Sequence, residues 1–177
     1  ERIIHSSGDL TLQSCLSFSP NACEEAINAL KKGAKIVTDT YMAKAAIAPM
    51  AKRTLKTDIK CILSMAPESV DSYLTTRSSV GMRNMWLNFH DKDELFNAPI
   101  VVIGSSPTAL VSLLDLVESG MEKPSLIIGM PVGFVGVLES KNRLLKSNCS
   151  YIVLEGSKGG ASIAAATANA LLRISEK

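Results

Sequence analysis

The chain has 177 residues, the length of one globular domain, and can bury about two thirds of its unfolded surface. Hydrophobic residues make up 46% and charged residues 20%, a balance that excludes an intrinsically disordered protein. The net charge of +2, without a basic patch interleaved with aromatic residues, argues against nucleic-acid binding. No apolar run approaches the ~18 residues of a membrane span and no signal peptide is evident, so we expect a cytoplasmic protein without membrane contact.

Cysteine and histidine usage gives no sign of a metal centre. Four cysteines (15, 23, 61 and 149) show no CxxC pairing, and the chain has two histidines. A zinc site is therefore not expected. Buried free thiols in a reducing compartment are the simplest interpretation.

The first five residues, 1–5, have the pattern of the end of a helix or strand whose beginning is absent. We therefore expect that an N-terminal segment before residue 1 is missing. Beyond it, short apolar runs alternate with longer helical segments, the pattern of a parallel sheet covered by helices on both faces. The predicted helices are residues 22–32, 41–52, 69–89, 108–119, 136–146 and 160–173.

The predicted strands are residues 34–38, 59–63, 99–104, 126–129 and 151–154. Several are continuous runs of Ile, Val and Leu, as in strands buried on both faces. We therefore predict one α/β domain over residues 1–177, with three layers and a mainly parallel central sheet of about five strands. The charged stretch at 91–94 is predicted to be a solvated loop.

Glycine-bearing turns follow the last three predicted strands, at residues 104–108, 129–136 and 155–162. In the first, Ser106 is expected to cap a helix that starts at Pro107, with the hydroxyls of Ser105 and Thr108 in the adjoining crevice. A buried strand that passes through glycine into a helix presents backbone N–H groups that can bind an anion. None of the turns has the pattern of a dinucleotide fold, a P-loop or a hydrolase elbow. Together, at the carboxyl ends of successive strands, they predict a ligand rich in carboxylate or phosphate.

Residues 104–110, 129–136 and 139–141, read together, resemble the precorrin-8X methylmutase family, also called precorrin isomerases. The resemblance continues through residues 2–5, Asp39 with Met42, 76–78, 158–160 and Asn169. It therefore spans nearly the whole chain in one order, and the run from 129 to 141 is highly specific.

This resemblance implies an intramolecular methyl-transferring isomerase of cobalamin (corrin) biosynthesis. Such an enzyme moves a methyl group from C-11 to C-12 of precorrin-8X, or of cobalt-precorrin-8, by a suprafacial 1,5-sigmatropic shift that yields hydrogenobyrinate or cobyrinate. The resemblance also implies a homodimer with substrate pockets at the subunit interface. No organic cofactor is expected, and cobalt only where the substrate already carries it.

Two residues stand out as candidates for catalysis and carboxylate binding. His5 aligns with the family's catalytic histidine, the proposed proton donor, and imidazole ordinarily titrates near pH ~6.5. Without the resemblance, a lone histidine after two isoleucines is more often a core residue. Arg77, within Thr76-Arg77-Ser78, matches the arginine that reaches the substrate; the alternative is a surface arginine. A planar guanidinium can bind a carboxylate through two hydrogen bonds. His90 lies outside any motif and is expected to be an exposed bystander.

The remaining substrate-binding candidates supply donors for a flat, apolar ring fringed with carboxylates. They are Arg2, Thr76, Ser78, Ser105, Thr108, Gly133, Ser140, Lys141, Gly159 and Gly160. Arg2 could instead orient His5, and Ser140 and Lys141 could lie on a solvated face. The rearrangement itself needs one acid to protonate a ring nitrogen, and neither a nucleophile nor a metal.

Three positions depart from the family pattern, which usually has serine at Ala161, a basic residue at Ser157 and glycine at Ala46. These changes could reduce the number of contacts to the substrate carboxylates without changing the candidate acid, His5. Two other functions stay open at this point: a catalytically silent tetrapyrrole-binding or carrier protein, and a nucleotide-binding doubly wound domain.

Overall fold

A six-stranded sheet runs through the centre of the structure, a computed structural model that describes residues 1–70, 75–90 and 97–176. Its order is β1-β6-β5-β4-β2-β3, and every neighbouring pair is parallel except β1 with β6. The strands are β1 (Leu16–Phe18), β2 (Ile36–Thr38), β3 (Ile59–Cys61), β4 (Ile100–Ile103), β5 (Leu126–Gly129) and β6 (Tyr151–Leu154). The predicted α/β class with a mainly parallel sheet is confirmed, with one strand more than the five expected.

The additional strand, β1, lies at the edge of the sheet and runs antiparallel to β6, with Leu16 opposite Leu154. Its three residues are partly buried or exposed, and Phe18 is half exposed. Such a short edge segment has no apolar run in the sequence. Its pairing partner supplies the backbone hydrogen bonds that make it a strand.

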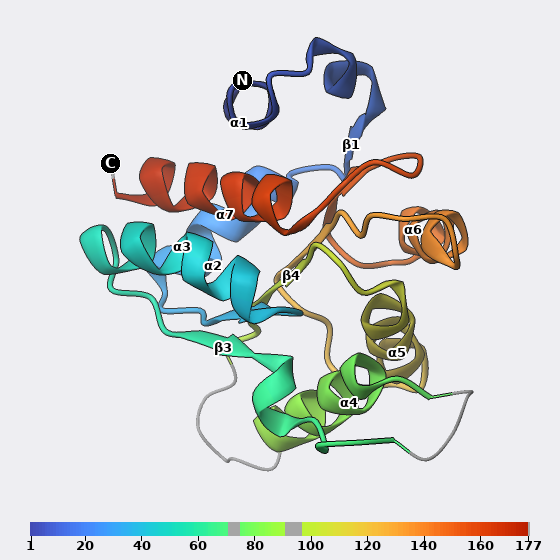
Figure 1. Ribbon diagram of the computed structural model, residues 1–177. Helices are drawn as coiled ribbons and strands as arrows, with labels where there is room; N and C mark the ends of the chain where they lie inside the picture. The colour runs from blue at the N-terminus through green and yellow to red at the C-terminus, as the bar shows by residue number, and fades with distance from the viewer. Residues whose placement is uncertain (71–74, 91–96, 177) are drawn as a thin grey trace.

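Helices cover both faces of the sheet (Figure 1). They are α1 (Arg2–Ser7), α2 (Ala22–Lys31), α3 (Tyr41–Arg53), α4 (Arg77–His90), α5 (Pro107–Glu118), α6 (Val137–Lys146) and α7 (Ala161–Ser175), with the 3-10 helices η1 (Leu10–Cys15) and η2 (Ile62–Met65). On one face, Ile100 and Val102 of β4 share a core with residues of α1, α2, α3 and α7. On the other, Val101 and Ile103 pack with residues of α4, α5 and α6. Because successive strand side chains point to opposite faces, the continuous apolar run in β4 serves both cores.

The largest difference from the predicted elements concerns the helix expected at 69–89. The structure begins α4 at Arg77, and residues 71–74 lie outside the described residues. Gly81, which interrupts the apolar pattern of this helix, allows η2 to approach. A Cβ there would lie 2.5 Å from the carbonyl oxygen of Ile62. The strand expected at 59–63 ends at Cys61, where the chain turns into η2.

Several smaller expectations can also be compared with the structure. The first residues form the short helix α1. Ser106 caps α5 by accepting the N–H of Ala109, and Pro107 begins the helix, as predicted. The loop prediction for 91–94 and the side chain of His90 lie outside the described residues. Within the described part of the chain, no helix is both long and apolar enough to cross a bilayer.

Candidate functional site

The three glycine-bearing turns lie side by side at the carboxyl ends of β4, β5 and β6. The N–H of Met130 donates to the carbonyl of Ile103 at 2.8 Å, which joins the second turn to the end of β4. The N–H of Gly160 donates to the carbonyl of Met130 at 2.9 Å, and that of Gly133 to Ser157 at 3.2 Å. The turns therefore form one connected edge, the place where ligands bind in parallel sheets.

The backbone N–H groups of the first turn are already occupied by an internal carboxylate. Asp39, directly after β2, is fully buried. Its Oδ2 accepts the N–H groups of Gly104 (3.1 Å), Ser105 (2.6 Å) and Ser106 (2.8 Å). Burial raises the pKa of this carboxyl above its ordinary value, and the three amide bonds oppose that rise. The expectation that these amides are available to an anionic ligand is therefore wrong for the first turn.

Glycine is required in the third turn because two backbone segments approach closely there. A Cβ on Gly159 would lie 2.1 Å from the carbonyl oxygen of Met130 and 2.9 Å from that of Pro131. Gly160 and Gly133 adopt φ of 124° and 130°, a region that glycine enters without steric cost. These glycines thus shape the edge and bring the turns into contact.

Lys141 and Ser140 of α6 lie inside the protein, with Lys141 beneath the third turn. The Lys141 ammonium donates to the carbonyl oxygens of Gly156 and Lys158, both at 2.7 Å, and the residue is 1% exposed. Burial lowers the pKa of Lys141 from 10.5 to about 8. The Ser140 hydroxyl donates to the carbonyl of Val137 at 2.9 Å. The alternative of a solvated face is therefore wrong for both residues.

Two of the predicted hydroxyls meet where α4 and α5 begin. Thr76 Oγ1 lies 2.7 Å from Thr108 Oγ1, which in turn lies 3.0 Å from Ser106 Oγ. Thr76 and Thr108 line a hollow of about 420 Å³ that extends to Val135 and Gly136 of the second turn. The sequence therefore identified two segments that the fold brings together.

The arginine next to these hydroxyls is on the surface. Arg77 opens α4, is exposed, and donates from Nε to the carbonyl of Pro67 at 2.8 Å. Ser78, the next residue, is partly buried. Because a guanidinium carries further N–H donors, the contact with Pro67 orients the Arg77 group without using its whole donor capacity.

Apolar side chains that the sequence reasoning did not single out project from the second turn. Phe134 is 91% exposed and Val135 is 88% exposed. Val132 of the same turn and Leu138, the second residue of α6, are each 47% exposed. Exposed apolar side chains grouped on one loop are typical of binding surfaces. The sequence signal that could have predicted this surface is the apolar content of residues 129–136, a turn in which glycines are interspersed with large apolar side chains.

The candidate acid lies on another part of the chain. His5 and Arg2 are exposed on α1, which packs against α7 and buries Ile3. Among the described residues, His5 lines a hollow of about 640 Å³ with Glu1, Arg2, Ile4 and Leu10. The hollow that contains Thr76 and Thr108 has no residue of α1. Among the described residues, His5 and these two threonines therefore line different hollows.

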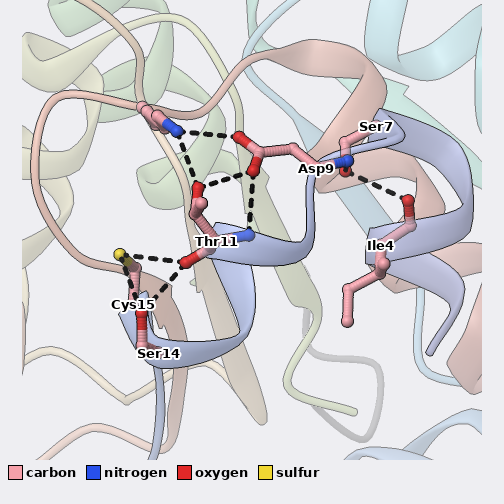
Figure 2. Close-up of polar contacts among 7 residues, drawn as sticks. Ile4, Ser7, Asp9, Thr11, Ser14 and Cys15 are labelled. Carbon is pink, nitrogen blue, oxygen red and sulfur yellow. Dashed lines mark hydrogen bonds and ion pairs between the residues drawn. The ribbon is translucent and has the colours of Figure 1, made fainter.

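The segment after α1 is nonetheless bonded to the third turn through Asp9 and Thr11, both labelled in Figure 2. Asp9 Oδ1 accepts the N–H of Thr11 at 2.9 Å and its hydroxyl at 2.5 Å. Asp9 Oδ2 pairs with the Lys158 ammonium at 2.7 Å, and that ammonium also donates to Thr11 Oγ1 at 3.0 Å. These bonds lower the pKa of Asp9 from 3.8 to about 2.

Metal-ligating side chains are not clustered in the part of the chain that the structure describes. Within residues 1–70, 75–90 and 97–176, no group of three or more His, Cys, Asp and Glu side chains could hold a metal ion. The four cysteines are free thiols, with Cys61 and Cys149 buried.

Comparison with known proteins identifies the family. A family model described as precorrin-8X methylmutase matches residues 1–174. The chain belongs to the precorrin-8X methylmutase family. Methylmutases are isomerases, and this member is therefore an isomerase of cobalamin biosynthesis. The resemblance inferred from the residues alone is confirmed.

Relatives in this methylmutase family align with the chain almost from end to end. A precorrin-8X methylmutase from Pseudomonas aeruginosa is 36% identical over 178 residues, which cover 96% of this chain and 80% of that protein. A cobalt-precorrin-8 methylmutase from Synechocystis sp. is 35% identical over 187 residues, which cover 98% and 82%. The solved precorrin-8x methyl mutase from Thermus thermophilus has a TM-score of 0.84 and 31% identity, with coverage of 98% and 83%.

Proposed function

We propose that this isomerase converts precorrin-8X to hydrogenobyrinate, or cobalt-precorrin-8 to cobyrinate, by moving a methyl group from C-11 to C-12. Relatives at 35% and 36% identity carry both substrate names. The observation that carries the proposal is the edge formed by three connected glycine turns, with hydroxyls at one end and exposed apolar side chains beside them.

The chemistry of the edge suits a flat apolar macrocycle fringed with carboxylates. Phe134 and Val135 offer apolar surface for the ring. We assign the side-chain carboxylates to Arg77 and to the hydroxyls of Thr76 and Thr108, since charged and hydroxyl donors pair well with carboxylate. The remaining contacts are assigned to Arg2, Ser78, Ser105, Gly133, Gly159 and Gly160. Lys141, being buried, holds the third turn in shape through the carbonyls of Gly156 and Lys158, and the buried Ser140 bonds within α6.

His5 is the proposed general acid. Protonation of a ring nitrogen draws electron density from the conjugated system, so the C-11 to methyl bond breaks as the C-12 to methyl bond forms. The proton returns to His5 afterwards, and the isomerisation leaves no net change in atoms or electrons. No organic cofactor is needed, and cobalt enters only with the substrate.

A homodimer would bring His5 to the substrate. His5 is exposed, and the hollow it lines contains neither Thr76 nor Thr108. The exposed apolar side chain of Leu10, which lines the same hollow as His5, is of the kind that a second copy covers. We therefore place the substrate pocket at an interface between two copies. The free thiols support a reducing cytoplasm as its location.

The test combines turnover of precorrin-8X with binding of hydrogenobyrinate, followed by its visible spectrum. His5→Ala should lower kcat by about 10²-fold to 10⁴-fold while product binding is largely retained, because the general acid is lost. Arg77→Lys should raise KM about tenfold with little change in kcat, because lysine cannot form the two-bond contact. Arg53→Lys, on the exposed end of α3, is the matched control and should change neither quantity.

Two outcomes would contradict this assignment. Turnover by His5→Ala at the wild-type rate would remove the histidine from the mechanism. Binding of hydrogenobyrinate by a wild-type protein that never converts precorrin-8X would favour the carrier function over the enzyme. Sedimentation at working concentration checks the dimer separately.

A further inference from the structure

Helix α1, which carries His5, is short and packs against α7. It has six residues, of which Ile3 is buried. Isolated helices of this length are unstable in water, so its position depends on the contacts around it. Gly8 ends the helix at φ 66°, and Asp9 follows directly. Asp9 is therefore the first side chain beyond the helix, and its contacts add to the packing of α1 against α7.

Asp9 joins this segment to the third glycine turn. Its carboxylate pairs with the Lys158 ammonium at 2.7 Å, and the same ammonium donates to Thr11 Oγ1 at 3.0 Å. The pKa of Asp9, lowered to about 2 chiefly by its bond to Lys158, keeps the carboxylate charged throughout the neutral range. A second hydrogen bond lies at the end of η1, where the N–H of Glu155 donates to the carbonyl of Cys15 at 2.7 Å.

Lys158 itself projects from a backbone that is bound on two sides. Its carbonyl oxygen accepts the buried Lys141 ammonium at 2.7 Å. Two residues later, the N–H of Gly160 donates to the carbonyl of Met130 in the second turn. Gly159 lies so close to Met130 that no Cβ fits between them. The Lys158 side chain therefore extends from a defined point of the glycine edge.

We propose that Lys158 and Asp9 are positioning residues, which fix α1 relative to the glycine edge and so place His5 for proton transfer. The proposal rests on the proposed role of His5 as the acid. Proton transfer requires hydrogen-bond reach between donor and acceptor, and a displacement of about 1 Å can cost about 10²-fold in rate. An exposed ion pair contributes little to the free energy of unfolding. We therefore expect the Asp9–Lys158 pair to affect the position of α1 more than the stability of the whole protein.

The experiment compares Lys158→Met and Asp9→Asn with the conservative Lys158→Arg. Each of the first two should lower kcat about tenfold and leave KM within about twofold, because neither side chain touches the substrate. Lys158→Arg keeps the pairing and should restore most of kcat. The double variant should be no slower than either single variant. Backbone hydrogen exchange in α1 should speed up in Lys158→Met and Asp9→Asn.

The matched control is Glu118→Gln, which weakens a surface ion pair between α5 and α6, where Glu118 Oε2 lies 2.6 Å from Arg143 Nη2. This variant should change neither kcat nor exchange in α1. Wild-type kcat in both Lys158→Met and Asp9→Asn would overturn the proposal. So would a rise in KM at constant kcat, which would make them substrate ligands.

The exchange measurement separates this proposal from the function on which it rests. Full turnover by His5→Ala would refute the general acid. Unchanged exchange in α1 of Lys158→Met would refute the positioning role, whatever the outcome for His5→Ala.

Discussion

The Oδ2 atom of Asp39 lies 2.6 Å from the backbone nitrogen of Ser105, a residue 66 positions later in the chain. The same oxygen accepts the N–H groups of Gly104 and Ser106, so one carboxylate joins the end of β2 to the turn after β4. This turn has the geometry of an anion site that the protein fills itself. In the proposed function, other donors bind the substrate carboxylates, and we propose Arg77 and the hydroxyls of Thr76 and Thr108 for that role.

Replacement of Asp39 by alanine should destabilise the protein. Asp39→Ala leaves three backbone N–H groups without their acceptor, and an unsatisfied buried donor costs about 1–3 kcal/mol. We expect a loss on the order of 3 kcal/mol in the free energy of unfolding, measured by urea denaturation. Asp39→Asn keeps one acceptor oxygen and should lose less.

The control for this substitution is Asp58→Ala, at an exposed carboxylate before β3. It should change the free energy of unfolding by no more than about 0.5 kcal/mol. An Asp39→Ala variant as stable as Asp58→Ala would show that the three amides find equivalent partners elsewhere.

Substitution of Gly159 should disrupt the contact between the second and third turns. Gly159→Ala places a Cβ 2.1 Å from the carbonyl oxygen of Met130, and backbone has to move to relieve the overlap. We expect a loss of about 3 kcal/mol in thermal or urea unfolding, together with weaker binding of hydrogenobyrinate. Gly156→Ala is the matched control, since its φ of 77° is strained but its surroundings are open. It should cost only about 1 kcal/mol, and equal losses at the two positions would contradict the steric explanation.

Burial of Lys141 should make the stability of the protein depend on alkaline pH. The folded-state pKa of about 8 lies below the ordinary value of 10.5, so between these values the unfolded chain binds a proton that the folded protein lacks. The free energy of unfolding contributed by this group therefore rises with pH across that window, by at most about 1.4 kcal/mol per pH unit. Below pH 8 the contribution is constant.

The measurement compares wild type with Lys141→Met by urea unfolding from pH 7 to pH 10. The difference in stability between the two should shift in favour of wild type above pH 8, because methionine carries no titrating group. The free energy of unfolding of Lys52→Met, at an exposed position on α3, should change with pH in parallel with that of wild type. A Lys141→Met curve that is also parallel would show that the ammonium keeps its ordinary pKa.

Local patterns determined much of the fold and the outline of the edge. The strands at 126–129 and 151–154 match the predicted boundaries, because continuous Ile, Val and Leu runs signal burial on both faces. Ser106 and Pro107 predicted the start of α5, because serine caps a helix and proline suits its first position. The order of the glycine turns also followed from the sequence, since carboxyl ends of parallel strands meet at one edge. The short edge strand β1 was not predicted, because its pairing partner β6 lies far along the chain.

Only the tertiary structure decided which donors at that edge are available. Asp39, Lys141 and Lys158 are all visible in the sequence, but their partners are set by packing between elements distant in the chain. A hydrogen bond requires atoms within about 3 Å of each other, a precision that periodicity cannot supply. The same limit applies to His5, whose residue type suits an acid but whose position is set by the packing of α1 against α7.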